Sequence, residues 1–400
     1  MYGRYPVINA ANMLFLLATL LAVTSQSIPM FVVARALTGC AVASNVLNPA
    51  IVGDMFVSEE RGGAVSLIFL APLLGGALGP AIASAVAERT GWRSVLWLGI
   101  GMAGVCEVVF LTCFRETYKV AILRRRAVQR GLVTGKGGEG EGVEGRRWKE
   151  LREAVLRPAR VLFGSGVLMA MSAFGSVVFS YYYVMSTTLS EIMRDIYGLD
   201  PVSAGFCFIS FSKLTPPGCW LGVVELGWEI LTGVTGMGSI FSVFVCNRHL
   251  DRIYIKMRDA NKGVGLPEFR LPLVVVGAFC MPLVTAFYGW SAELRLGVHF
   301  TLLSAALMGS ALALALIPLT AYIVDAFGIY SASATTGVIV TRCLMSTFLP
   351  LLTGPLVDNF GYGWAFNVWA ALCLMLVPIP ILVLRYGAHW RRLSPYSRDQ

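Results

Sequence analysis

Residues 1–21 read MYGRYPVINAANMLFLLATLL, in which a short basic turn passes directly into a long apolar run. Comparable runs recur along nearly the whole chain, and 56% of its 400 residues are hydrophobic while 14% are charged. Soluble domains average about 25% charged residues, so a water-soluble core could not enclose this much apolar surface. Runs of about 20 apolar residues fit spanning helices, which satisfy their own backbone hydrogen bonds within lipid. The sequence therefore predicts an all-α, polytopic membrane protein.

The apolar runs predict about ten transmembrane helices. One run, at 202–246, is anomalous because it is too long for one helix and poorly composed for two. The predicted spans are 7–24, 29–50, 64–87, 93–113, 160–186, 202–246, 272–290, 296–322, 331–352 and 364–384.

Basic residues divide the gaps between these spans into two alternating sets. Most Lys and Arg fall in the set that includes both ends of the chain, and such residues collect on cytoplasmic loops. We therefore expect both termini in the cytoplasm. We attribute the formal net charge of +9 to this topology rather than to a nucleic-acid partner. The basic set comprises 1–6, 51–63, 114–159, 247–271, 323–330 and 385–400.

The segment 114–159 begins and ends basic and has a Gly/Glu-rich, low-complexity centre. This composition predicts a flexible cytoplasmic linker, and its basic ends also suit contact with anionic lipid. It divides the chain into a four-helix part at 1–113 and a six-helix bundle at 160–384, with a tail at 385–400. The nine cysteines form no CxxC pair and no His cluster accompanies them, so neither a metal site nor a cofactor is predicted.

Several short motifs follow one another in a definite order. They are YGRYPV (2–7), RALTG (35–39), GDMFVSEERGGA (53–64), LAPLLGGALGPAIAS (70–84), LDRIY (250–254), EFRLPL (268–273) and YIVDAFGIYSASA (322–334). Over essentially the whole chain, they resemble the major facilitator superfamily, specifically fungal drug:proton antiporters with twelve helices. The resemblance implies a monomeric secondary transporter in the plasma or vacuolar membrane, not an enzyme. Such a protein exports small organic compounds in exchange for protons by alternating access.

Three of these motifs carry roles implied by the resemblance. Gly3 and Arg4 match the end of the loop between the family's helices two and three, which implies that the first two helices are absent here. Arg35 and Gly39 match a helix-four motif; the arginine either influences proton coupling or ties helices together through carbonyl groups. In the third motif we expect a cytoplasmic charge network that latches one conformation, the alternative being a solvated loop. Its members would be Asp54, Glu59, Glu60 and Arg61.

The motif at 70–84 places small residues four apart on one helical face, at Gly75, Gly79 and Ala83. Small residues let two helix backbones approach closely, and Pro80 removes a helix hydrogen bond and permits bending. The pattern resembles an antiporter motif of the family's helix five, from which Ala71, Gly76 and Ser84 depart. Ordinary tight helix packing is the alternative reading.

Few ionisable or polar side chains fall inside the predicted spans. Glu107 is the one clear intramembrane carboxylate, and it either carries a proton or is protonated without a role. Tyr182 and Tyr183 either line the substrate cavity or anchor a helix end at the membrane interface. The candidate proton or substrate residues are Arg35, Asn45, Glu107, Tyr182, Tyr183 and Arg342.

The segment 212–233 interrupts the anomalous run with Lys213, Glu225, Glu229 and a Pro-Pro pair. Joining the two sides restores one ordinary span, so we expect an insertion of artefactual origin; a re-entrant excursion buried in protein or water is the alternative. For function, the alternatives to a proton-coupled exporter are an uptake carrier of the same fold, a non-transporting polytopic protein, or a truncated fragment without activity.

Overall fold

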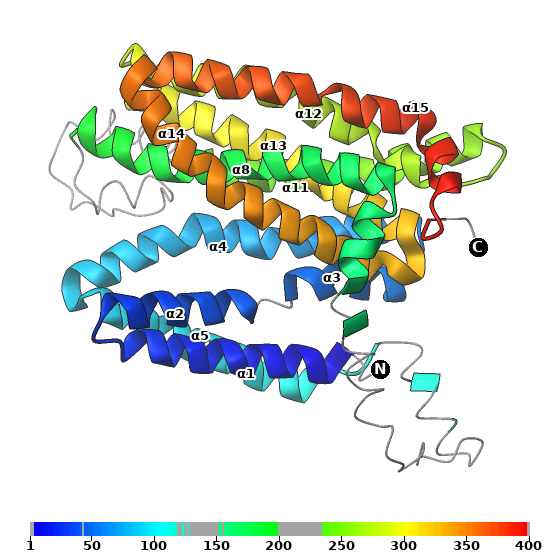
Figure 1. Cartoon of the computed structure of the whole chain (residues 1–400), viewed down its shortest axis with the longest axis horizontal. Coiled ribbons are helices and arrows are strands. Elements are labelled where there is room, and N and C mark those ends of the chain that lie inside the picture. The colour runs from blue at the N-terminus through cyan, green and yellow to red at the C-terminus, as the bar shows by residue number, and fades with distance from the viewer. Residues whose placement is uncertain are drawn as a thin grey trace, which may run out of the picture. The chain divides into compact units, whose positions relative to one another are not determined.

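The computed structural model describes residues 4–41, 44–117, 122–123, 127, 152–153, 156–198 and 234–397. Within these ranges every regular element is a helix, as predicted (Figure 1). The predictions made for Gly3, for the centre of the linker and for the insert at 212–233 lie outside the described residues. Asn45 and Pro80 fall in described helices, but their side chains lie outside the description.

The helices follow the predicted spans closely. The first five are α1 (Arg4–Val23), α2 (Ile28–Cys40), α3 (Ser44–Met55), α4 (Arg61–Thr90) and α5 (Trp92–Cys113). The later ones are α8 (Gly166–Asp195), α11 (Val234–Ala260), α12 (Pro272–Glu293), α13 (Val298–Phe327), α14 (Ser331–Leu376) and α15 (Pro378–Leu393), with short 3-10 turns η1 (Pro267–Arg270) and η2 (Gly328–Tyr330).

Two differences from the predicted spans have local causes. The predicted span 29–50 is divided between α2 and α3. The spans 331–352 and 364–384 share α14, which is broken at Gly361, where φ is 75°. This left-handed conformation favours glycine, and a Cβ there would lie 2.7 Å from Glu293 Oε2. The break falls where the sequence predicts a gap between two spans.

Six described helical segments are long and apolar enough to cross a membrane. They are Arg4–Val23, Trp92–Cys113, Gly166–Asp195, Pro272–Glu293, Val298–Phe327 and Ser331–Leu393. This is the composition expected of a polytopic membrane protein.

The contacts divide the chain into two units. The first comprises 1–56 and 86–160, and the second comprises 57–85 and 161–400. Most of α4 therefore belongs with the later helices, although it continues into the first unit at its end. The domain boundaries predicted at 113 and 160 stay a prediction.

In the first unit, α1 packs against both α2 and α5. Most residues of α5 are exposed, among them large apolar side chains such as Trp97, Met102 and Val105. Among the described residues of α5, the buried one is the carboxylate Glu107. An apolar exterior around a buried polar group is the arrangement expected of a helix in lipid.

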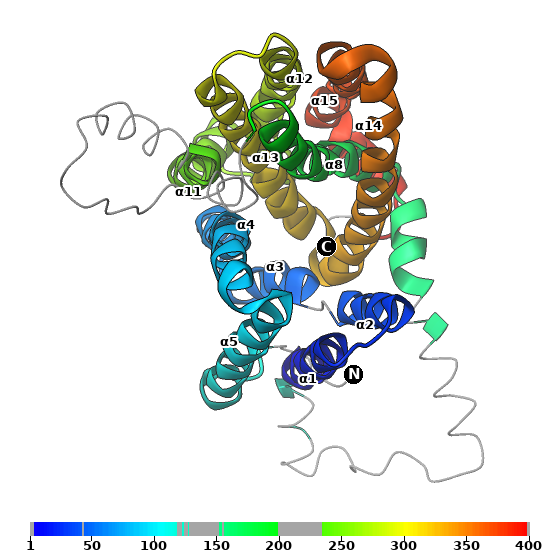
Figure 2. The same cartoon turned by 90° about the vertical axis from the view of Figure 1, so that its left-hand side faces the viewer.

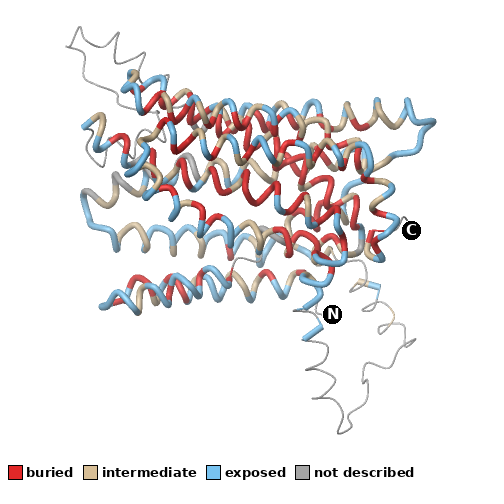
Figure 3. The backbone as a smooth tube through the Cα atoms, turned by 45° about the horizontal axis from the view of Figure 1, so that its top comes forward, coloured by how far each residue is buried: buried red, intermediate tan, exposed pale blue. Residues whose placement is uncertain are grey.

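In the second unit, α12 packs against α13 and α14, α8 packs against α14 and α13, and α11 packs against α13 (Figure 2). Buried residues concentrate in the helices of this unit (Figure 3). Among its described membrane-length helices, α13 is the most thoroughly buried. Its small residues admit close neighbours: a Cβ on Gly277 of α12 would lie 2.8 Å from the backbone nitrogen of Ala315.

Among the described residues no close neighbour is seen at Gly75 or Gly79, so the close helix approach predicted for α4 stays a prediction. A Cβ added at Gly75 or at Gly79 would meet no heavy atom within 4 Å. Glycines do permit close approach of two helix backbones at other described positions. At Gly238 of α11 and Gly277 of α12, an added Cβ would collide with the backbone of α13. Spacing alone did not identify which helix face meets a neighbour.

Replacing Gly277 by alanine is expected to destabilise the protein, because overpacking a filled contact costs about 1–3 kcal/mol. The matched change Gly79→Ala should be neutral or slightly stabilising, since its Cβ meets open space and alanine favours a helix. Thermal unfolding of both purified variants in detergent measures the difference. Equal unfolding temperatures would contradict the packing described for α12 and α13.

Candidate charge cluster at the start of α4

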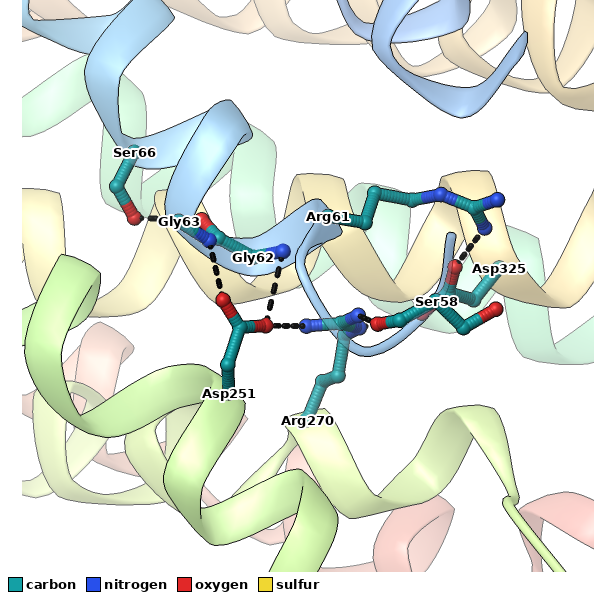
Figure 4. Close-up of polar contacts among 8 residues, drawn as sticks. All are labelled: Ser58, Arg61, Gly62, Gly63, Ser66, Asp251, Arg270 and Asp325. Atoms are coloured by element: carbon teal, nitrogen blue, oxygen red, sulfur yellow. Dashed lines mark hydrogen bonds and ion pairs between the residues drawn. The ribbon is translucent and has the colours of Figure 1, made fainter. Parts of the chain in front are cut away.

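The first turn of α4 leaves backbone N–H groups without helical acceptors. Asp251 of α11 accepts two of them: its Oδ1 lies 3.0 Å from the nitrogen of Gly62 and its Oδ2 lies 2.7 Å from that of Gly63 (Figure 4). A carboxylate at this position also interacts favourably with the helix dipole. The carboxylate of a distant helix therefore caps α4.

The two glycines permit this approach. A Cβ at position 62 would lie 2.5 Å from Asp251 Oδ1 and 2.6 Å from Arg270 Nη1. A Cβ at position 63 would lie 2.9 Å from Asn247 Oδ1. Side chains at these positions would push the start of α4 away from α11.

Arg270, at the end of η1, is fully buried and joins three segments. Its Nη1 donates to Asp251 at 3.2 Å, its Nε donates to Asp325 at the end of α13, and its Nη2 donates to the carbonyl of Ser58 (Figure 4). The guanidinium also lies 4.8 Å above the ring of Tyr254, and burial raises the pKa of that hydroxyl.

Arg61 completes the arrangement by pairing with Asp325 (Figure 4). Two guanidinium groups thus face two carboxylates, and their formal charges balance. Desolvating such a group is costly unless its partners are all present. We call the residues Ser58, Arg61, Gly62, Gly63, Asp251, Arg270 and Asp325 the α4 cluster.

Two further ion pairs flank the α4 cluster. Glu59 pairs with Arg258 at an exposed position. Glu268 and Arg391 form a buried two-point pair, with distances of 2.7 and 3.0 Å, that ties η1 to α15.

The predicted network among the acidic and basic residues of 53–64 is corrected by these contacts. Asp54 pairs with Arg4 at 2.8 Å in the first unit, whereas Glu59 and Arg61 pair with residues of the second. Glu60 is exposed, and its side chain makes no hydrogen bond or ion pair with any described residue. The loop therefore reaches several separate partners.

Sequence reasoning missed Asp251, Arg270 and Asp325 as partners. Each lies within a quoted motif, LDRIY, EFRLPL or YIVDAFGIYSASA, and in a gap of the basic set. Their shared position in the basic gaps was the signal in the sequence that could have identified them as partners. Nothing in the sequence pairs residues separated by 189 or 264 positions.

Apart from the Arg4–Asp54 pair, the structure shows no contact among the described residues that were predicted in the first unit. Arg4 is buried, and its backbone nitrogen donates to Glu116 at 2.9 Å. Arg35 is exposed, with its guanidinium 5.1 Å from the ring of Phe31, and a Cβ on Gly39 would meet open space. The Arg35 side chain makes no ion pair and no hydrogen bond with a described residue, so neither the carboxylate nor the carbonyl partner of its two predicted roles is seen there.

Glu107 is 3% exposed and its Oε2 accepts a hydrogen bond from Asn12 Nδ2 at 2.6 Å. Its Oε1 is buried without a hydrogen-bond partner in the described structure, and so is Oδ1 of Asn9, one turn earlier on α1. Two buried acceptors therefore lack a donor.

The remaining predicted residues come together between α8 and α14. The guanidinium carbon of Arg342 lies 4.1 Å from the ring centre of Phe179. That ring lies 5.5 Å from Tyr183, which in turn lies 5.8 Å from Tyr182. The structure thus assembles three sequence-predicted residues around an aromatic ring that the sequence did not single out.

Comparison with known proteins gives the family. Residues 1–343 match the family model described as Major Facilitator Superfamily. The chain belongs to the major facilitator superfamily. The MFS-type transporter tndD of Aspergillus flavipes is 29% identical, with the match covering 97% of this chain and 69% of that protein. The efflux pump radE of Floropilus chiversii is 27% identical, and the match covers 100% of this chain and 70% of that protein.

Solved structures of major facilitator proteins share the fold. The proton:xylose symporter XylE bound to 6-bromo-6-deoxy-D-glucose superposes with a TM-score of 0.61 at 15% identity, covering 96% of this chain and 80% of that one. The human organic anion transporter MFSD10 superposes with a TM-score of 0.62 at 17% identity, covering 94% of this chain and 77% of that one. These structures show the fold, while the family match and the transporters among the relatives indicate a membrane transporter.

Replacing Arg270 by methionine is expected to destabilise the protein by about 3–5 kcal/mol, because two carboxylates lose a buried partner. The control Glu59→Gln breaks an exposed pair, which is worth about 0–1 kcal/mol. Unfolding of the purified proteins in detergent separates the two. If the two variants have the same free energy of unfolding, Arg270 does not stabilise the α4 cluster.

Proposed function

We propose that this transporter exports small organic compounds in exchange for protons by alternating access, and that the α4 cluster is its cytoplasmic latch. The observation that carries the proposal is the capping of Gly62 and Gly63 by Asp251, with Arg270 buried beside it. The following steps give the physical support.

All the segments of the α4 cluster fall in gaps predicted on one side of the membrane. Asp251 and Arg270 lie in the basic gap 247–271, Asp325 lies in 323–330, and the start of α4 lies in 51–63. Basic gaps of this kind favour the cytoplasmic face. A latch built from these segments would therefore act at the cytoplasmic face.

The chemistry of the α4 cluster suits an element with two states. Its contacts are hydrogen bonds and ion pairs, and buried ion pairs roughly balance their desolvation cost. When the cluster separates, water at the cytoplasmic face solvates each charge. Neither state is then strongly favoured, which is what a switching element needs.

Helix α4 connects the proposed latch to both units of the chain. Its start is held by α11, η1 and α13 in the second unit, and its last residues belong to the first unit. Releasing the start of α4 therefore frees a rigid helix that enters both units. This is a physical route by which a local charge event can alter access to a midplane site.

Glu107 is the proposed proton carrier. An ionised carboxylate inside an apolar span is costly, and lies there when it has a partner or a function. One proton on Oε1 would convert an unsatisfied acceptor into a donor. A proton thus completes the site. Export is favoured over uptake by the efflux pump radE among the relatives and by the resemblance of the motif at 70–84.

A short bifunctional thiol crosslinker joining Glu59→Cys to Arg258→Cys should stop transport, since it fixes the start of α4 to α11. Both residues lie at the exposed edge of the α4 cluster. The experiment uses a background without native cysteines, reconstituted vesicles and a reducible crosslinker. Transport should return on reduction, and each single-cysteine variant serves as a control. Full transport by crosslinked protein would exclude the latch.

Replacing Glu107 by glutamine keeps the side-chain shape but removes the exchangeable proton. We expect substrate exchange to persist while efflux driven by a pH gradient is lost. Vesicles loaded with fluorescent cationic, neutral and anionic aromatic compounds report both activities. Glu191→Gln, at an exposed position of α8, is the matched control. Undiminished gradient-driven efflux by Glu107→Gln would assign coupling to another residue.

A further inference from the structure

Arg342 lies near the middle of a membrane-spanning helix. It is 11 residues after Ser331, where α14 begins, which corresponds to about 17 Å along the helix axis. The hydrocarbon core of a bilayer is about 30 Å thick, so this position is close to the midplane. An arginine at such a depth is costly and marks a functional site unless a partner accounts for it.

The described residues provide no carboxylate partner for Arg342. Its guanidinium lies over the uncharged ring of Phe179, and its Nε is buried without a hydrogen-bond acceptor. The buried arginines elsewhere in the described chain differ in this respect. Arg4 pairs with Asp54, Arg270 with Asp251 and Asp325, and Arg391 with Glu268. Arg342, whose Nε is buried, has no such anion among the described residues.

The surroundings of Arg342 combine an aromatic wall with a seam of hydroxyl groups. Tyr182 and Tyr183 extend the aromatic surface from Phe179 along α8, and Tyr183 is 44% exposed. On the neighbouring face, Ser176 donates to Thr341 at 3.3 Å, and the hydroxyls of Ser180 and Ser346 lie 3.4 Å apart. These hydroxyl groups satisfy one another or the backbone, so they leave the guanidinium charge unbalanced.

We propose that Arg342 binds the anionic group of the transported compound, and that the compound is an aromatic organic acid with a single carboxylate. The planar guanidinium matches a carboxylate in two-point geometry. Phe179, Tyr182 and Tyr183 would contact the adjoining aromatic part, since aromatic pairs gain from edge and offset contacts. One carboxylate neutralises the one uncompensated cation, so the loaded site carries no net charge. The inference rests on the proposed transport function, but not on proton coupling.

Binding to the 400-residue chain in lipid nanodiscs tests this assignment. The probes are naphthalene-2-carboxylate, its methyl ester and naphthalene-2-methylamine, with affinities measured by equilibrium dialysis. We expect the carboxylate to bind at least about tenfold more tightly than the ester, and the amine to bind most weakly. Equal binding of carboxylate and ester, or no saturable carboxylate binding, would overturn the proposal.

Variants then assign the preference to Arg342. Arg342→Gln should remove the difference between carboxylate and ester, and Arg342→Lys should keep part of it, since lysine retains the charge but not the planar fork. Arg194→Gln, at an exposed arginine paired with Asp195, should leave the preference intact. An unchanged preference in Arg342→Gln would overturn the proposal; if that variant does not fold, an unchanged preference in Arg342→Lys would do so.

Efflux measurements separate this inference from the proposed function. Vesicles that export neutral or cationic aromatic compounds but not the carboxylate would retain the transport function and contradict the anion site. Vesicles that export none of the compounds would contradict the transport function, and the binding measurements would still decide whether Arg342 recognises an anion.

Discussion

The salt bridges of Arg270 with Asp251 and Asp325 are the contacts on which the start of α4 depends. A fully buried guanidinium is stable only if its acceptors are present at the same time, because each missing partner leaves a desolvated charge. Here the acceptors come from α11, from α13 and from the carbonyl of Ser58. The loop before α4, the end of η1 and the ends of two helices must therefore assemble together. Gly62 and Gly63 make this assembly sterically feasible.

Two other charged side chains each have one buried polar atom without a hydrogen-bond partner in the described structure. Glu107 has a buried oxygen without a donor, and Arg342 has a buried nitrogen without an acceptor. A proton would complete the first and a carboxylate would complete the second. An exchanger must bind two different ligands in different states, and these two groups offer one site for each. The α4 cluster, in contrast, balances its charges internally, which suits a gate rather than a binding site.

Much of the helical fold was readable from sequence, because lipid requires long apolar helices and α5, α12 and α13 are such runs. The polar end of α11 extends to Ala260, beyond the predicted limit of 246, since hydropathy does not report a helix that leaves the membrane. The site was only partly readable. Arg61, Glu107 and Arg342 stood out as charges in informative places, but their surroundings depend on contacts between distant segments. The glycine spacing of α4 meets the same limit: periodicity gives a face, but not the element that covers it.

The central claim is that the start of α4 leaves Asp251 and Arg270 during transport. Spin labels on Glu60→Cys and Arg252→Cys, both at exposed positions, would report the distance between the start of α4 and α11 in a background without native cysteines. In reconstituted vesicles, the account predicts two distance populations by pulsed electron paramagnetic resonance. Asp251→Asn should shift the balance toward the longer one. A single distance distribution, unchanged by Asp251→Asn and by a pH gradient, would contradict it.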